Sequence, residues 1–188
     1  MVRSLNVSEE DVWLDFVSSV FIDTPRDYFY RHIHNDPDQQ VHQHIFVALE
    51  DGNTLITQTS QILGTLRVFQ RSFLHYNDIQ PMGGIGEVSV SPSHRRKGIA
   101  TKLLHKAIQH MKEGNPKPIS APESKMPFIW SSLHTGEAAP LYRTVGYQSM
   151  PLSFSTIEYK TLPKAKKDND TDTIYRHVDF DADIAVSS

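Results

Sequence analysis

One stretch, residues 85–113, changes from the periodicity of a strand to that of a helix around a short basic loop. In the strand that we expect there, alternate side chains share a face, and Val88 and Val90 lie on the same one. The opposite face then carries Ile85, Glu87 and Ser89. Pro92 ends the strand because it has no N–H to donate to a neighbouring strand.

Beyond the basic loop, apolar residues recur about every 3.6 positions, which predicts an amphipathic helix that ends near Glu113. The apolar residues are Ile99, Leu103, Leu104, Ala107, Ile108 and Met111. Gly114 follows a last turn that holds His110 and Lys112, as helix C-termini favour. The segment is therefore a strand, a basic loop with a glycine, and a helix.

This order of elements predicts an anion-binding site at the start of the helix. The first four N–H groups of a helix have no partner within it and lie at the positive end of its dipole. Gly98 has no Cβ, so an anion can approach the backbone closely, and Arg95, Arg96 and Lys97 add positive charge. The alternative is a solvated basic helix start. The sequence has neither a G-x-x-x-x-G-K-[ST] nor a G-x-G-x-x-G pattern, so a P-loop and a dinucleotide fold are not supported.

Two motifs in this part of the chain resemble those of a known family. R-R-K-G-I-A, residues 95–100, resembles the [QR]-x-x-G-x-[GA] signature of the GNAT superfamily of acyl-CoA-dependent N-acetyltransferases. A-A-P-L-Y-R-T-V-G-Y, residues 138–147, resembles the A-x-x-x-Y-x-x-x-G-[FY] element of the same family. The resemblance covers roughly residues 55–159. It implies an α/β fold of three layers, in which helices flank a central mixed, mostly antiparallel β-sheet.

Bulk composition bounds the class of protein. The chain has 188 residues, 38% of them hydrophobic and 22% charged, as expected for one globular domain. We expect that domain at residues 1–162, followed by a polar and possibly flexible tail at 163–188. Cysteine is absent, which excludes disulfides and a thiol nucleophile. No membrane span or signal peptide is indicated, so the expected location is cytoplasmic, with nuclear as the other possibility.

Several further elements follow from local patterns. Two helices are expected before residue 35, and in the resembled family such helices border the acceptor cleft. Short polar turns and runs rich in Pro and Gly divide the rest of the chain. We expect strands at 2–7, 45–49, 61–69 (extending to about 75), 128–133, 147–150, 154–159 and 173–180, a loop at 77–84, and a short helix at 137–145.

Ten histidines raise the question of a metal site. The pairs His32-x-His34 and His42-x-His44 share a face if they lie on strands, but diverge if they lie on a helix. No carboxylate has the spacing that would complete a set of ligands. A metal is therefore not expected.

The resemblance to the family implies roles for individual residues. The pyrophosphate of acetyl-CoA is expected on the loop and helix start, and its pantetheine arm along the central strand, as an added β-strand would lie. Tyr142 matches the family's tyrosine general acid, and Glu87 is the candidate base, acting directly or through water. Many relatives carry a cofactor-contacting asparagine where this chain has Thr135, which leaves that contact in doubt. The implied cofactor-binding residues are Val88, Ser89, Val90, Arg95, Arg96, Lys97, Gly98, Ile99, Ala100, Thr101 and Thr135.

The function expected from the sequence is direct acetyl transfer from acetyl-CoA to a primary amine, in a ternary complex with a small molecule or a peptide or protein acceptor. The alternative is a noncatalytic acyl-CoA-binding or interaction module on the same fold. Nucleic-acid binding through the basic loop is disfavoured, because the net charge is −3 and the basic cluster is short. The expected partners are acetyl-CoA and an amine acceptor, with no nucleic acid or membrane, and a homodimer is possible.

Overall fold

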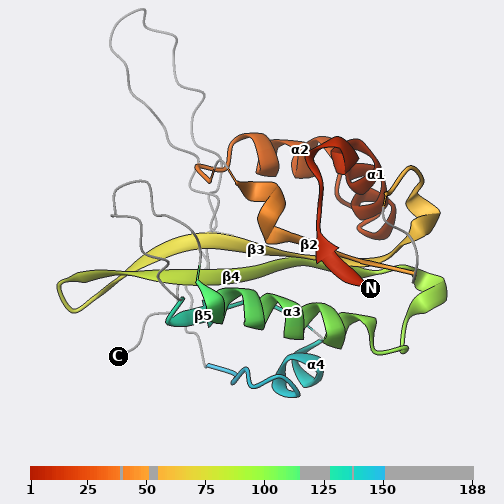
Figure 1. Cartoon of the computed structure of the whole chain (residues 1–188). Coiled ribbons are helices and arrows are strands. Elements are labelled where there is room, and N and C mark those ends of the chain that lie inside the picture. Colours follow the sequence, from red (N-terminus) through yellow and green to blue (C-terminus); the bar gives the residue numbers. More distant parts are fainter. Residues whose placement is uncertain (39, 51–54, 115–127, 137, 151–188) are drawn as a thin grey trace, which may run out of the picture.

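The computed structural model describes residues 1–38, 40–50, 55–114, 128–136 and 138–150. Their strands form one sheet in chain order, antiparallel except for the last pair, β4 and β5, which is parallel. The expected mixed, mostly antiparallel sheet is confirmed (Figure 1). The strands are β1 (Val2–Ser4), β2 (Ile45–Leu49), β3 (Ile62–His75), β4 (Asp78–Val90) and β5 (Trp130–Ser132).

Helices cover both faces of the sheet and make three layers (Figure 1). α1 (Glu10–Val20) and α2 (Arg26–His34) lie on one face, and α3 (Ile99–Glu113) lies on the other with the short α4 (Ala139–Arg143). Each face has its own apolar core: Trp13, Phe29 and Val47 belong to the first, and Phe46, Leu66 and Leu104 to the second. Single 3₁₀ turns, η1 to η4, occupy Val7–Glu9, Val41–His44, Thr59–Gln61 and Pro92–His94.

The central helix begins and ends where its sequence predicts. α3 starts after Gly98 and is followed by Gly114, both with positive φ, and its apolar stripe packs on the sheet. Glycines in the sheet let it lie close. A Cβ on Gly64 would lie 3.1 Å from Ile99 Cγ2, and one on Gly83 would overlap the Met111 side chain. The two contacts hold both ends of α3 against the sheet.

A β-bulge interrupts the pairing of β4 with β3. Ser89 pairs with Thr65 and Gly86 with Arg67, so Glu87 and Val88 together oppose one residue of β3. Glu87 has φ 54°, a conformation that costs a non-glycine residue energy and that bulges use to turn a side chain. The bulge also changes which side chains share a face.

One assignment of the strand's faces is therefore wrong. Ile85, expected beside Glu87, instead packs in the α3-side core with Val88 and Val90. Glu87 contacts His32 of α2, so the expectation that it opposes the two valines is confirmed. A regular alternation does not survive an extra residue in the strand.

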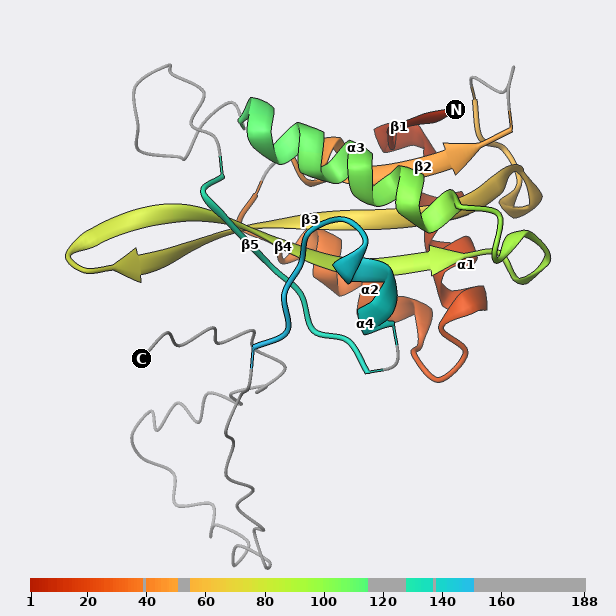
Figure 2. The ribbon, with the colours of Figure 1, turned by 90° about the horizontal axis from the view of Figure 1, so that it is seen from below.

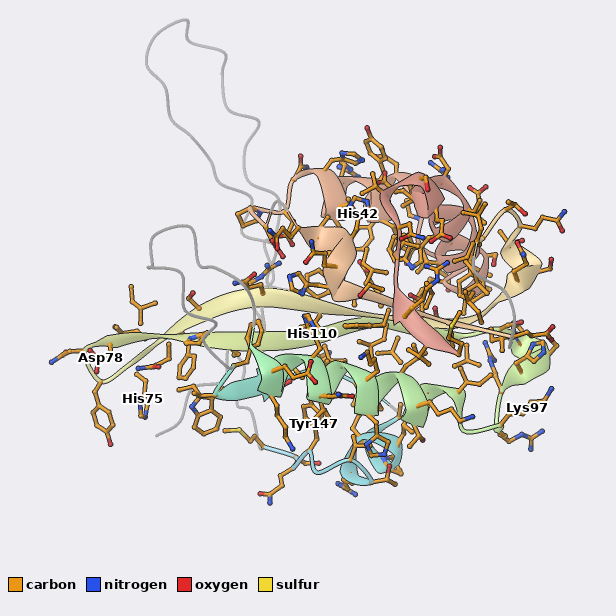
Figure 3. The ribbon with its side chains drawn as sticks, viewed as in Figure 1. His42, His75, Asp78, Lys97, His110 and Tyr147 are labelled. Atoms are coloured by element: carbon orange, nitrogen blue, oxygen red, sulfur yellow. The ribbon has the colours of Figure 1, made fainter. Side chains whose placement is uncertain are left out.

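Two other local predictions are wrong. Of residues 77–84, expected as a loop, all but the first belong to β4, which pairs with β3 in an arm whose tip carries His75 and Asp78 (Figure 3). The glycines read there as turn signals include Gly83, which is required by close packing against α3. Residues 147–150, expected as a strand, have no strand pairing in the described part of the chain. The strands expected at 154–159 and 173–180, and the boundary at 162/163, lie outside the described residues.

A buried histidine pair joins the last turn of α3 to the segment before β2. His44 is 1% exposed, its Nδ1 lies 2.8 Å from His110 Nε2, and its Nε2 lies 3.2 Å from Asp38 Oδ2. His110 lies between α3 and the sheet (Figure 3). Burial lowers the pKa of both rings, and that of His110 falls from 6.5 to about 4, with His44 as the second cause. One ring must donate the shared hydrogen and the other must accept it, so double protonation breaks the contact.

The pair predicts a loss of stability in mild acid. Between about pH 6.5 and 4 the unfolded chain binds a proton at residue 110 that the folded chain does not. The free energy of unfolding should therefore fall as the pH drops through this window, by up to roughly 3 kcal/mol from this residue. Urea denaturation at several pH values gives the free energy of unfolding as a function of pH. Between about pH 6.5 and 4 this free energy should fall less steeply for His110→Gln than for wild type. His105→Gln, an exposed histidine of the same helix, is the control, and equal slopes in all three proteins would contradict the assignment.

Candidate active site

Among the described residues, β4 has an open edge beyond its first half. β5 pairs with β4 only through Met82–Gly84 and then diverges from it (Figure 2). Ser91 donates its N–H to Leu63 O at 2.9 Å, and backbone groups of successive residues in an antiparallel strand point to opposite sides. The N–H and C=O of Val90 therefore face away from β3, toward this edge. The edge offers backbone hydrogen bonds of the kind that an extended ligand can use.

A cleft of about 470 Å³ lies between this edge, the start of α3 and α4. Its walls bring together residues from both sequence motifs, although the motifs are about 40 positions apart. The lining residues are Val88, Ser89, Val90, His94, Arg95, Arg96, Gly98, Ile99, Ala100, Thr101, Ala138, Leu141 and Tyr142.

The start of α3 presents free backbone amides to the cleft. The first bond of the helix runs from Lys102 N to Gly98 O, so the amides of the three residues before Lys102 have no partner within it. No side chain caps this end. Gly98 has φ 74° and nothing within 4 Å of the position that a Cβ would take, so the backbone is accessible there. Arg95 lies beside the strand edge, with its Nε 3.4 Å from Val90 O.

Tyr142 forms the opposite wall. It is 8% exposed, belongs to the apolar core on the α3 side, and is the fourth residue of α4, two positions after Pro140. Its ring meets that of Tyr147 edge-on, with 6.2 Å between centroids. Burial raises the pKa of Tyr142, so its hydroxyl keeps its proton at neutral pH. A protonated phenol at this wall has a hydrogen available to donate.

Glu87 lies on the other face of β4 from the cleft. Its side chain is 7% exposed, with Oε1 at 3.4 Å from His32 Nδ1 and at 3.7 Å from Arg67 Nη1. Arg67, 1% exposed, also donates from Nη2 to Asp36 Oδ2 at 2.7 Å and to the His32 carbonyl at 3.1 Å. Burial lowers the pKa of Arg67, while Glu87 and then Asp36 raise it. A network of charged groups thus backs the strand at its bulge.

The structure brings most predicted site residues together, but not all. Lys97 lies in the loop before α3 at the outer end of the molecule and does not line the cleft, nor do Glu87 and Thr135 (Figure 3). Sequence reasoning missed His94 and Leu141, which adjoin the two motifs and line the cleft. It also missed the contact of His32 with Glu87, which joins positions 55 residues apart and has no local signal.

Comparison with known proteins identifies the family. Residues 1–150 match the acetyltransferase (GNAT) domain family. The chain belongs to this family and is an acetyl-CoA-dependent acyltransferase. Comparison with curated proteins finds no match.

Solved structures share the fold at low sequence identity. A predicted acetyltransferase from Clostridium acetobutylicum, solved with acetyl-CoA, superposes with a TM-score of 0.62 at 18% identity over 84% of this chain and 95% of its own. Glucosamine-6-phosphate N-acetyltransferase from Arabidopsis thaliana gives 0.57 at 17% identity over 84% and 97%. An aminoglycoside 6′-N-acetyltransferase from Acinetobacter haemolyticus gives 0.55 at 16% identity, with the same coverage. At these identities the similarity establishes the fold alone.

The described residues contain neither a membrane-spanning helix nor a cluster of metal ligands. None of the described helices has the length and apolar character needed to cross a membrane. Within the same ranges, no group of three or more His, Asp or Glu side chains is arranged to hold a metal ion.

Gly98 tests the anion site at the start of α3. We expect Gly98→Trp to lower the affinity for acetyl-CoA by at least roughly a hundredfold, because the indole would fill the space beside the free amides. The positive φ should also cost about 1–2 kcal/mol of stability. Gly146→Trp is the matched control, since Gly146 has φ 100° and equally open space but lies away from the helix start. Calorimetry that shows equal acetyl-CoA affinity for the two variants would contradict the site.

Proposed function

We propose that this protein transfers the acetyl group of acetyl-CoA directly to a primary amine, with both substrates bound in a ternary complex. The observation that carries the proposal is the cleft itself. It joins an anion-binding helix start, an open strand edge and a buried tyrosine, which are the three parts that acyl transfer from a large phosphorylated thioester requires. The acceptor is a small molecule or a peptide or protein amine.

The residues of the cleft fit acetyl-CoA. The free amides after Gly98 suit a pyrophosphate, with Arg95 and Arg96 as additional cations. Val90 directs its backbone groups to the open edge of β4, where an extended pantetheine arm would bind as an added strand does. The bound cosubstrate supplies an activated thioester with a thiolate leaving group.

The reaction must move two protons. One bond forms between the acceptor nitrogen and the acetyl carbon, and the carbon–sulfur bond breaks. Of the two protons that an ammonium acceptor loses, one ends on the sulfur and the other goes to solvent. A backbone N–H beside the bulge would stabilise the charge that develops on the thioester oxygen, as preorganised donors do. On the acceptor side, the Glu87 carboxylate serves the removal of the proton from the amine. Tyr142 supplies the proton for the sulfur.

The experiment that tests the proposal is thiol release from acetyl-CoA across a panel of primary amines, with the acetylated products identified by mass spectrometry. We expect amine-dependent release with stoichiometric amide formation. Tight binding of acetyl-CoA without transfer to small amines, peptides or proteins would contradict the proposal.

Tyr142→Phe tests the acid. The ring and its packing are kept, so stability and acetyl-CoA affinity should change little. Turnover should fall by roughly one to three powers of ten, because the lost donor acts mainly in the transition state. Tyr147→Phe is a matched control: this neighbouring tyrosine is partly buried, and its hydroxyl shares a hydrogen bond with Ser131 Oγ. It should lose about 1 kcal/mol of stability and retain turnover. Equal turnover in the two variants would remove Tyr142 from the mechanism.

A further inference from the structure

We propose that His32 of α2 is the base that takes the proton from the acceptor amine, and that Glu87 is its positioning residue. The inference rests on the proposed function and specifies how the acceptor loses its proton. It follows from the geometry of a small cluster on the α2 face of β4, at the residue that precedes Val88 of the cleft.

Glu87 itself is poorly placed to meet an acceptor. Its side chain is 7% exposed, its Oε1 faces His32 and Arg67, and its Oε2 is buried without a hydrogen-bond partner among the described residues. A base must reach the proton that it removes, either directly or through one water. The carboxylate is covered, so a substrate can approach it only past its neighbours.

His32 is the exposed member of the pair. Its side chain is 37% exposed, and its Nδ1 is the nitrogen that lies 3.4 Å from Glu87 Oε1. A carboxylate at Nδ1 fixes the hydrogen there and leaves Nε2 as the free acceptor of a proton. The tilted ring of Tyr28 one turn earlier, 3.9 Å away between centroids, and an edge contact with Phe69 hold the ring in place.

Charged groups of three elements lie around this pair. Glu87 on β4 faces both His32 and Arg67, and Arg67 and Arg71 on β3 both face Asp36 after α2. Tyr28 also contacts the His32 ring. When the ring accepts a proton, Glu87 lies beside the new imidazolium.

The backbone at Glu87 supports a functional reading over a purely structural one. Arg67 faces two carboxylates, and its shorter contact is with Asp36 at 2.7 Å, against 3.7 Å to Glu87. Glu87 is nevertheless held at positive φ in a bulge, where strain persists only if the surroundings impose it. The strain places the carboxylate under His32.

The first test needs no acceptor. In ¹⁵N-labelled wild-type protein at pH 8, long-range ¹H–¹⁵N spectra should show His32 with its hydrogen on Nδ1 and a bare Nε2. Glu87→Leu, which removes the carboxylate, should give a mixture of the two tautomers. A wild-type His32 with its hydrogen on Nε2 would overturn the proposal, whether or not the leucine variant folds.

The second test measures transfer to the amine of the panel that wild type acetylates fastest. His32→Gln should lower kcat/KM by roughly 10²- to 10⁴-fold and remove a limb of the pH profile between pH 5 and 8, where imidazoles titrate. Added imidazole should partly restore His32→Ala. His34→Gln is the matched control: this histidine of the same helix also pairs with a glutamate, Glu10, at 2.8 Å, and its variant should keep both rate and profile.

The outcomes separate the two proposals. If His32→Gln keeps the rate and the limb while Glu87→Gln loses both, Glu87 is the direct base and the role of His32 is refuted. If wild type binds acetyl-CoA but acetylates no amine, the proposed function fails. Even then, the tautomer measurement decides whether Glu87 holds the His32 hydrogen on Nδ1 and leaves Nε2 free to accept a proton.

Discussion

The bulge in β4 is the constraint on which the rest of the site depends. It places one extra residue opposite β3, turns Glu87 toward α2, and leaves Val88 and Val90 on the side of α3. Past Gly84, β4 no longer pairs with β5. The short stretch of β4 from there to Val90 therefore contributes to two surfaces. One surface is an open edge beside the anion site, and the other is a charged cluster under α2. In an uninterrupted strand Ile85 and Glu87 would share a face, so the carboxylate could not lie under α2 while Ile85 packs on the side of α3.

The charged cluster costs stability that the apolar cores must offset. A buried guanidinium and its carboxylates lose hydration that their attraction only partly returns, and apolar replacements of such groups are often neutral or stabilising. Removing a single partner is different, because it leaves a buried charge unpaired at a cost of about 3–5 kcal/mol. Arg67, 1% exposed and bonded to both Asp36 and the His32 carbonyl, is therefore best explained by what it positions.

The sequence predicts the parts of the fold whose signals are local. The 3.6-residue spacing, Gly98 and Gly114 give the limits of α3, and the two motifs give the residues that meet in the cleft. It does not predict the bulge, since glutamate has no preference for positive φ and only the pairing with β3 imposes it. Gly83 is misread as a turn residue because its partner, Met111, lies on a different element. The contact of His32 with Glu87 likewise depends on tertiary structure.

The close contacts of Gly64 and Gly83 under the two ends of α3 have a mechanical consequence. A helix of 15 residues, about 22 Å long, packs closely on the sheet at both ends, which opposes sliding along the sheet and tilting away from it. The wall of the cleft that runs from the first turn of α3 to the bulge is therefore the fixed one. The opposite wall is α4, a helix of five residues. We therefore expect differences in acyl length among thioesters to be accommodated on the α4 side, where Leu141 lines the cleft, rather than at α3.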